Sequence, residues 1–153
     1  MTNDKGHPFL EEEFNAFSKV CKEQGIKVTP QRLEIFREVM RAHDHPSAED
    51  IYNRVKDRLP SISLDTVYRT LAAFESYGLV GRVPIVDKTR FDSNRKVHHH
   101  LVCIVCKSLT DFYWAEFDQL EPPLDISVWG HTETRHVLIR GICSKCTEEG
   151  RKS

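Results

Sequence analysis

The chain has 153 residues, of which 39% are hydrophobic and 29% are charged, so it can bury a core and is not a wholly disordered protein. No apolar run approaches the ~18 residues of a membrane span, and residues 1–9 lack the apolar centre of a signal peptide. We therefore expect a soluble, cytoplasmic protein without a membrane partner. The 22 basic and 23 acidic side chains give a net charge of −1, which by itself does not indicate nucleic-acid binding.

The N-terminal part of the sequence predicts a series of helices. Apolar residues at spacings of three and four indicate helices over residues 11–23, 30–41, 48–59 and 64–77. Thr29, Ser47 and Ser63 occupy N-cap positions, and Asp50 follows Ser47 at the spacing of a capping box.

Two short strand-like runs, residues 79–85 and 89–92, follow the fourth helix and are joined by a turn at residues 86–88. The third and fourth helices, with a short turn between them, form a helix-turn-helix candidate. With the hairpin they predict a winged helix.

Beyond a polar linker at residues 93–96 the periodicity changes. Strands are predicted over residues 100–105, 109–113 and 137–142, with a short helix beginning at residues 118–120. The prolines at 122 and 123 are expected to end that helix.

The strongest chemical signal is a pair of Cys-x-x-Cys motifs, Cys103 with Cys106 and Cys143 with Cys146. Two such pairs, each beside a strand, can bring four thiolates around one Zn²⁺ in a closed structural site. Buried or redox-active cysteine pairs are the alternative. The fifth cysteine, Cys21, lies on an apolar helical face and is expected to pack in the core.

A second signal is the run His98-His99-His100. In an extended strand His98 and His100 point to the same side and His99 to the other. Nitrogen ligands from this pair, with carboxylates and a further histidine, would suit Fe²⁺, Mn²⁺ or Zn²⁺. Candidates near the pair or in a preceding loop are His45, Asp92 and Asp111; each of these could equally be a solvated side chain.

A third signal is the solvent-facing side of the fourth helix. Arginine can bind guanine or phosphate, and tyrosine and threonine can contact thymine methyl groups or the DNA backbone. An ordinary solvated helix face is the alternative. Residues 1–96 carry 16 basic and 15 acidic side chains, so a DNA-binding face needs local clustering. The candidate DNA contacts are Ser63, Asp65, Thr66, Tyr68 and Arg69, with Arg32 on the second helix.

These motifs, taken in order from about residue 25 to residue 146, resemble the ferric uptake regulator (Fur) family of metal- and peroxide-sensing repressors. No single stretch is decisive, but the ordered set is specific. The matching stretches are residues 28–32 (VTPQR), 45–52 (HPSAEDIY), 63–71 (SLDTVYRTL), 78–80 (GLV), 90–92 (RFD), 98–103 (HHHLVC), 111–112 (DF) and 143–146 (CSKC).

The resemblance implies an α+β protein and a homodimer. The winged helix-turn-helix domain would span residues 1–92, a hinge 93–97, and an α/β dimerisation and metal-binding domain 98–153. The four cysteines of the two motifs match the family's structural zinc ligands. The regulatory metal, Fe²⁺ or Mn²⁺ with Zn²⁺ also possible, would bind His45, Asp92, His98, His100 and Asp111. The DNA partner would be a double-stranded, palindromic, AT-rich operator.

Asp92 stands where iron-uptake members usually carry glutamate, and the aspartate resembles the peroxide-responsive branch. In that branch, iron reacts with hydrogen peroxide and oxidises ligand histidines, which here match His45 and His98. Many relatives have a third metal site, but this sequence departs from its pattern at Val97, His99 and Arg135. We therefore predict no third site.

Three alternative functions can be compared with these motifs. An iron- or zinc-uptake repressor would share the same fold without sensing peroxide. A small zinc hydrolase or deaminase is disfavoured because the sequence lacks HExxH and the deaminase combination of His-x-Glu with Pro-Cys-x-x-Cys. A zinc-stabilised protein-interaction module would lack sequence-preferring DNA binding.

Overall fold

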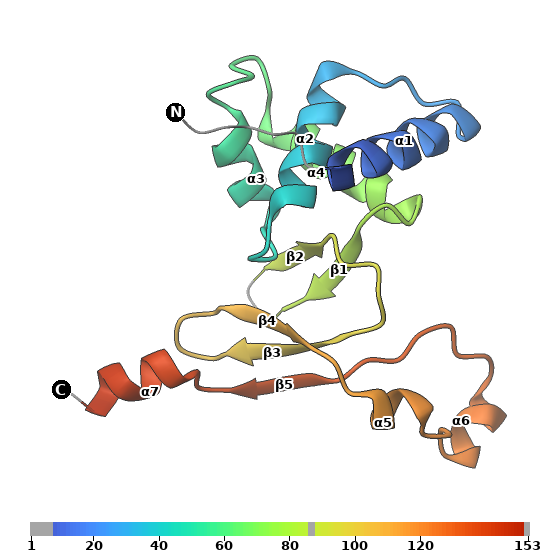
Figure 1. The fold of residues 1–153 in the computed structure, drawn as a ribbon, viewed down its shortest axis with the longest axis vertical. Coiled ribbons are helices and arrows are strands. Elements are labelled where there is room, and N and C mark those ends of the chain that lie inside the picture. The colour runs from blue at the N-terminus through green and yellow to red at the C-terminus, as the bar shows by residue number, and fades with distance from the viewer. Residues whose placement is uncertain (1–7, 86–87, 152–153) are drawn as a thin grey trace. The chain divides into compact units, whose positions relative to one another are not determined.

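The computed structural model describes residues 8–85 and 88–151 and divides the chain into two compact units, residues 1–95 and residues 96–153 (Figure 1). Residues 86 and 87 of the predicted hairpin turn lie outside the described residues. Within those ranges, no helix is both long enough and apolar enough to cross a membrane.

The first unit contains four helices and a two-stranded hairpin (Figure 1). β1 and β2 pair antiparallel, and the described part of this unit has the winged-helix arrangement that the sequence predicts. Its elements are α1 (Pro8–Glu23), α2 (Pro30–Arg41), α3 (Ala48–Val55), α4 (Leu64–Ser76), β1 (Gly81–Pro84) and β2 (Thr89–Asp92).

Three aromatic rings centre the core of this unit. The Phe17 and Phe36 rings stack with centroids 4.4 Å apart, and the ring of Phe74 meets both edge-on. These side chains come from α1, α2 and α4, so a single cluster joins three helices with favourable aromatic geometry. Cys21 is buried in the same core, which confirms the packing role expected of it.

Local capping explains where three of the helices begin. The side chains of Thr29, Ser47 and Ser63 each accept a backbone N–H from the first turn that follows, as the sequence predicts. Ser47 and Asp50 form the full capping box: the Ser47 N–H donates to Asp50 Oδ2 at 2.9 Å, and the Asp50 N–H donates to Ser47 Oγ at 3.2 Å.

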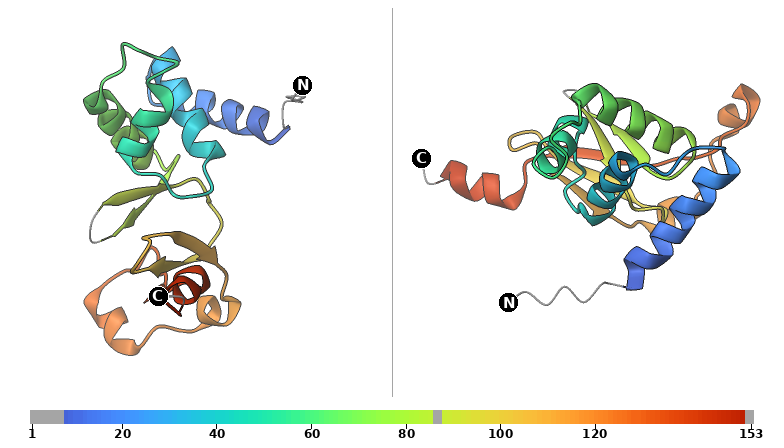
Figure 2. Two further views of the ribbon diagram at one scale, coloured as in Figure 1. Left: turned by 90° about the vertical axis from the view of Figure 1, so that its left-hand side faces the viewer. Right: turned by 90° about the horizontal axis from the view of Figure 1, so that it is seen from above.

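The second unit is a three-stranded sheet with short helices beyond both ends of the strands (Figure 2). Central β3 pairs antiparallel with β4 and parallel with β5, so the chain returns through α5 and α6 before β5 joins. The elements are β3 (His99–Cys103), β4 (Leu109–Phe112), α5 (Ala115–Gln119), α6 (Leu124–Trp129), β5 (Leu138–Gly141) and α7 (Ser144–Arg151).

Several predicted boundaries are wrong. Helix α3 stops at Val55, several residues before Pro60, because the N–H groups of Arg58 and Leu59 both bond to the Val55 carbonyl and close the turn there. The short helix begins at Ala115 rather than near Asp118. Helices α6 and α7 have no counterpart in the prediction. α6 has exposed apolar residues instead of the inward apolar stripe by which an amphipathic helix is recognised.

We predict that Ser47→Ala lowers the free energy of unfolding by about 1–2 kcal/mol, because it removes the side-chain half of the capping box at a buried position. Urea unfolding followed by helical circular dichroism measures the change. The matched control is Ser76→Ala, whose exposed hydroxyl bonds only to the Ala73 carbonyl at the other end of a helix. Its effect should stay within about 0.5 kcal/mol; equal losses in the two variants would contradict the capping role.

Candidate metal centres and DNA-reading face

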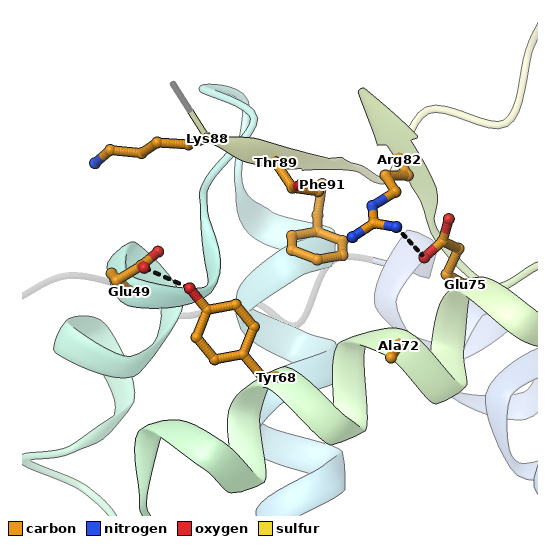
Figure 3. A pocket seen from close by; sticks show the side chains of 8 residues that line it. All are labelled: Glu49, Tyr68, Ala72, Glu75, Arg82, Lys88, Thr89 and Phe91. Atoms are coloured by element: carbon orange, nitrogen blue, oxygen red, sulfur yellow. Dashed lines mark hydrogen bonds and ion pairs between the residues drawn. The ribbon is translucent and has the colours of Figure 1, made fainter. Parts of the chain in front are cut away.

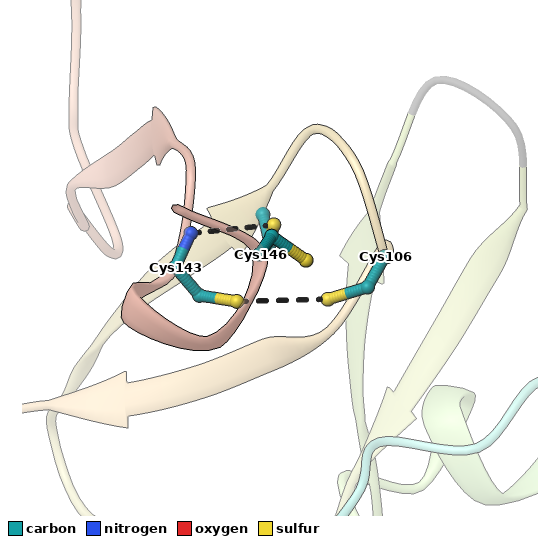
Figure 4. Close-up of side chains that lie close together, drawn as sticks. Cys106, Cys143 and Cys146 are labelled. Atoms are coloured by element: carbon teal, nitrogen blue, oxygen red, sulfur yellow. Dashed lines mark hydrogen bonds between the residues drawn. The ribbon is translucent and has the colours of Figure 1, made fainter. Parts of the chain in front are cut away.

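The structure brings the four cysteines of the two motifs together in the second unit. Their four sulfur atoms all lie within 4.8 Å of one another; the residues are Cys103, Cys106, Cys143 and Cys146. The Cys106 and Cys143 sulfurs are 3.9 Å apart, far beyond a disulfide bond (Figure 4). Four thiolates around a tetrahedral ion at ~2.3 Å would be about 3.8 Å apart, so the cluster has the dimensions of a metal site.

The thiols differ in how readily they lose their protons. The Cys143 N–H donates to the Cys103 sulfur at 3.4 Å and, with the Cys106 N–H, lowers the pKa of Cys103 to about 6. The Ser108 hydroxyl, 3.1 Å from the Cys106 sulfur, lowers the pKa of Cys106. The Cys143 thiol, burial and the two remaining sulfurs raise the pKa of Cys146 to about 12. A metal ion binds a thiol in its deprotonated form, so a cation bound at this cluster would favour the thiolate form of Cys146.

The second unit also collects three of the predicted regulatory ligands, His98, His100 and Asp111. His100 and Asp111 are register partners in β3 and β4. His98 Nε2 lies 3.0 Å from His100 Nε2, and Asp111 Oδ1 lies 3.7 Å and 3.5 Å from these nitrogens. Neighbouring ligands of an octahedral ion with ~2.1 Å bonds would be about 3.0 Å apart. Such a convergence of nitrogen lone pairs and a carboxylate suits a cation.

The ring of His98 is oriented by a backbone group. Its Nδ1 lies 2.6 Å from the Lys96 carbonyl oxygen, which can only accept a hydrogen bond. Nδ1 therefore carries a proton, which leaves Nε2, on the side of His100 and Asp111, as the nitrogen that could bind a cation. Histidine metal ligands are commonly oriented in this way by a carbonyl group on the other nitrogen.

The other two predicted regulatory ligands, His45 and Asp92, lie close together in the first unit. His45 Nε2 is 3.8 Å from Asp92 Oδ1, and the Asn94 N–H donates to the same oxygen at 2.7 Å. His45 has a positive φ of 50°, which is uncommon for a residue with a side chain and must be supported by its surroundings.

That support comes from β2. Arg90 Nη1 donates to the His45 carbonyl at 3.2 Å, and the Phe91 N–H donates to the Pro46 carbonyl at 3.0 Å. The chain then enters the capping box of Ser47. This role of Arg90 could not be predicted from the sequence, because a contact with a loop 45 residues earlier has no local signal.

His99 points to the opposite side of β3 from its neighbours, as strand alternation predicts. Its side chain is fully buried against the rings of Phe112 and Phe117. His99 Nδ1 accepts the Val137 N–H at 3.1 Å, and His99 Nε2 lies 3.2 Å from an oxygen of Asp118. This histidine thus connects β3 to the start of β5 and to α5.

The candidate DNA contacts all lie in the first unit, five of them on α4 or its cap. Arg69 forms an exposed ion pair with Asp65 at 2.9 Å, and the hydroxyl groups of Ser63 and Thr66 lie 2.8 Å apart. Tyr68 donates its hydroxyl to Glu49 of α3. Arg32 lies apart on α2, where its Nη1 donates to the Lys27 carbonyl at 2.8 Å.

A winged helix joined to a unit with thiol and histidine–carboxylate clusters defines a metal-binding regulator of transcription. A family model described as the ferric uptake regulator family matches residues 23–147. The chain belongs to this family of regulators, and it is not an enzyme.

Individual relatives agree with this assignment. The peroxide-responsive repressor PerR of Staphylococcus epidermidis is 35% identical over 143 residues, 92% of each chain. The Campylobacter jejuni peroxide stress regulator is 30% identical, with a TM-score of 0.66 over 84% of this chain and 97% of that one. The Helicobacter pylori ferric uptake regulator has a TM-score of 0.78 at 20% identity, over 90% and 93% of the two chains, and shows the shared fold.

We predict that Cys143→Ser lowers the bound metal by one ion per chain and exposes α7 and β5 to hydrogen exchange. The physical reason is that a structural metal site supplies roughly 10–16 kcal/mol of binding free energy, which a small unit cannot replace by packing. Elemental analysis and hydrogen-exchange mass spectrometry measure the two effects. The control, Cys21→Ala, should retain its metal; full metal content in Cys143→Ser would exclude the four-cysteine site.

Proposed function

We propose that the protein is a metal-dependent, DNA-binding transcriptional repressor that senses peroxide through Fe²⁺ bound between its two domains. The proposal rests on the clusters of histidine and carboxylate side chains that the structure contains in each of its two units. It is supported by the 35% identity of the chain to a peroxide-responsive repressor. A protein acting on operator DNA would work in the cytoplasm.

The proposed regulatory site joins the two sets of ligands around one ion. His45 and Asp92 would come from the winged-helix domain at residues 1–92, and His98, His100 and Asp111 from the domain at residues 98–153. Residues 93–97 would be the hinge. Two carboxylates balance the charge of a divalent ion, and a mixed nitrogen and oxygen set suits Fe²⁺ or Mn²⁺, with Zn²⁺ as a further candidate.

A ligand set drawn from two domains gives metal a way to control DNA binding. Binding energy is gained only when both domains supply their ligands, so metal shifts the population toward one domain arrangement. In a homodimer that arrangement would set the spacing of two α4 helices on the half-sites of a palindromic, AT-rich operator. We assign the DNA contacts to Ser63, Asp65, Thr66, Tyr68, Arg69 and Arg32.

The four-cysteine cluster is proposed to hold structural Zn²⁺. Four sulfur ligands favour zinc and leave no open coordination position for a reactant. The cluster would therefore maintain the fold of the second unit, and sensing would be left to the histidine and carboxylate site.

Peroxide sensing is assigned to the regulatory site because its ligands include histidines. When bound, Fe²⁺ would supply the reducing power for hydrogen peroxide, and His45 and His98 are the proposed positions of oxidation. Adding oxygen to either ring would remove a metal ligand. An iron- or zinc-uptake repressor without peroxide sensing is the alternative, since a ferric uptake regulator and a peroxide-responsive repressor are both similar to this chain.

We predict that His98→Ala loses metal-dependent operator binding, with affinity falling at least about tenfold at fixed salt, equivalent to about 1.4 kcal/mol. Fluorescence anisotropy with and without added metal measures this. His131→Ala, which changes an exposed histidine outside both clusters, is the control and should bind as the unmodified protein does. If His98→Ala retains full metal dependence, the assignment of the sensor site is wrong.

We predict that hydrogen peroxide adds one oxygen atom to His45 or His98 in the Fe²⁺ form and releases the DNA. Peptide mass spectrometry and anisotropy on the same anaerobically prepared sample measure both events. The Mn²⁺ form is the control, because it should keep its DNA and its unmodified histidines. Unmodified histidines in the Fe²⁺ form would favour the uptake repressor.

A further inference from the structure

A cavity of about 310 Å³ separates α4 from the β-hairpin within the first unit (Figure 3). Two aromatic rings, Tyr68 and Phe91, line it together with carboxylates from α3 and α4 and with basic side chains near the hairpin. The lining residues are Glu49, Tyr68, Ala72, Glu75, Arg82, Lys88, Thr89 and Phe91.

The hydroxyl of Tyr68 is held at the edge of this cavity by a charged acceptor. Tyr68, on the candidate DNA-reading face, is 45% exposed, and its O–H donates to Glu49 Oε1 (Figure 3). Glu49 belongs to α3 and lies 19 residues earlier in the chain. The bond therefore connects α4, which carries most of the candidate DNA contacts, to α3.

Glu49 is well suited to remain a charged acceptor. It lies in the first turn of α3, where the helix dipole favours negative charge. The Tyr68 hydroxyl, followed by backbone N–H bonding, lowers the pKa of Glu49, and the nearby Lys88 ammonium acts in the same direction. The same hydrogen bond raises the pKa of Tyr68, so the phenol keeps its proton at neutral pH.

The bond changes what Tyr68 can offer to DNA. A phenol has one proton to donate, and here Glu49 accepts it. The oxygen can then only accept from a base amino group, while the ring presents apolar surface that can contact a thymine methyl. The carboxylate beside it also repels phosphate, which disfavours use of the hydroxyl as a backbone contact.

We propose that Glu49 is a positioning and specificity-determining residue: by accepting the Tyr68 hydrogen bond it directs Tyr68 to read bases instead of binding phosphate. This inference rests on the proposed function, because it requires that α4 reads DNA. It adds a residue on α3, outside the proposed DNA contacts, to the determinants of operator choice.

The test is selection of binding sites from a random duplex library by metal-loaded full-length proteins at fixed salt. The unmodified protein should select a palindrome, and Tyr68→Ala should lose the base preference at one position in each half-site. Glu49→Ala should weaken the preference at that same position by about tenfold and raise affinity for non-selected DNA. Metal content and circular dichroism establish that each variant is folded.

Two further variants separate positioning from a general charge effect. Glu49→Gln keeps an oxygen acceptor and should restore the base preference, although its affinity for non-selected DNA should remain raised. Glu75→Ala removes an equal charge from the same cavity, where Glu75 pairs with Arg82 at 3.8 Å, and should leave the base preference unchanged.

Tyr68→Phe completes a double-mutant cycle with Glu49→Ala. If Glu49 acts through the hydroxyl, the two single variants lose the same preference and the double variant loses no more. An unchanged preference in Glu49→Ala, or additive losses in the cycle, would overturn the inference while leaving DNA binding intact. Failure of the unmodified protein to select any sequence would instead overturn the proposed function, and the inference with it.

Discussion

The convergence of four cysteine sulfurs is the constraint on which the second unit depends. The described part of this unit buries few apolar side chains, chiefly Val102 and Leu109, so hydrophobic burial alone provides little stability. Cys103 is the last residue of β3, and Cys106 lies in the turn after it. Cys143 and Cys146 follow β5, the parallel neighbour of β3. An ion held by these sulfurs would therefore join two strands whose connection is the longest in the unit. The effect is like that of a crosslink, which gains most when it closes a long loop.

The same strand that the cysteines anchor also positions the proposed sensor ligands. Along β3 and the residue before it, His98 and His100 face Asp111, whereas His99 faces the aromatic side chains behind the sheet. The two-residue period of a strand makes these roles inseparable, because a shift of one residue would turn the two proposed ligands toward the aromatic side chains and turn His99 toward Asp111. In the first unit, β2 has a similar double function. Arg90 holds the backbone of His45, and Asp92 on the same strand lies close to the His45 ring.

DNA recognition by a chain with a net charge of −1 must rely on local arrangement. On α4 the exposed Arg69 is paired with Asp65, and Tyr68 is bonded to Glu49. Carboxylates thus accompany two of the side chains proposed to contact DNA. If α4 binds DNA as proposed, this pattern would reduce unspecific attraction to phosphate and make binding depend more on base contacts and on the spacing of two subunits.

Features that depend on near neighbours could be predicted from the sequence alone. Thr29, Ser47 and Ser63 could be recognised as caps because a cap bonds within its own first turn, and the opposite orientation of His98 and His99 follows from strand geometry. The two Cys-x-x-Cys motifs could be recognised from ligand spacing. Three other features become apparent only in the folded chain: the parallel pairing of β3 with β5, the support of His45 by Arg90 and the bond from Tyr68 to Glu49. These contacts join residues 19 to 45 positions apart, and nothing in either local pattern specifies the partner. They form because the packing of whole elements brings the two groups together.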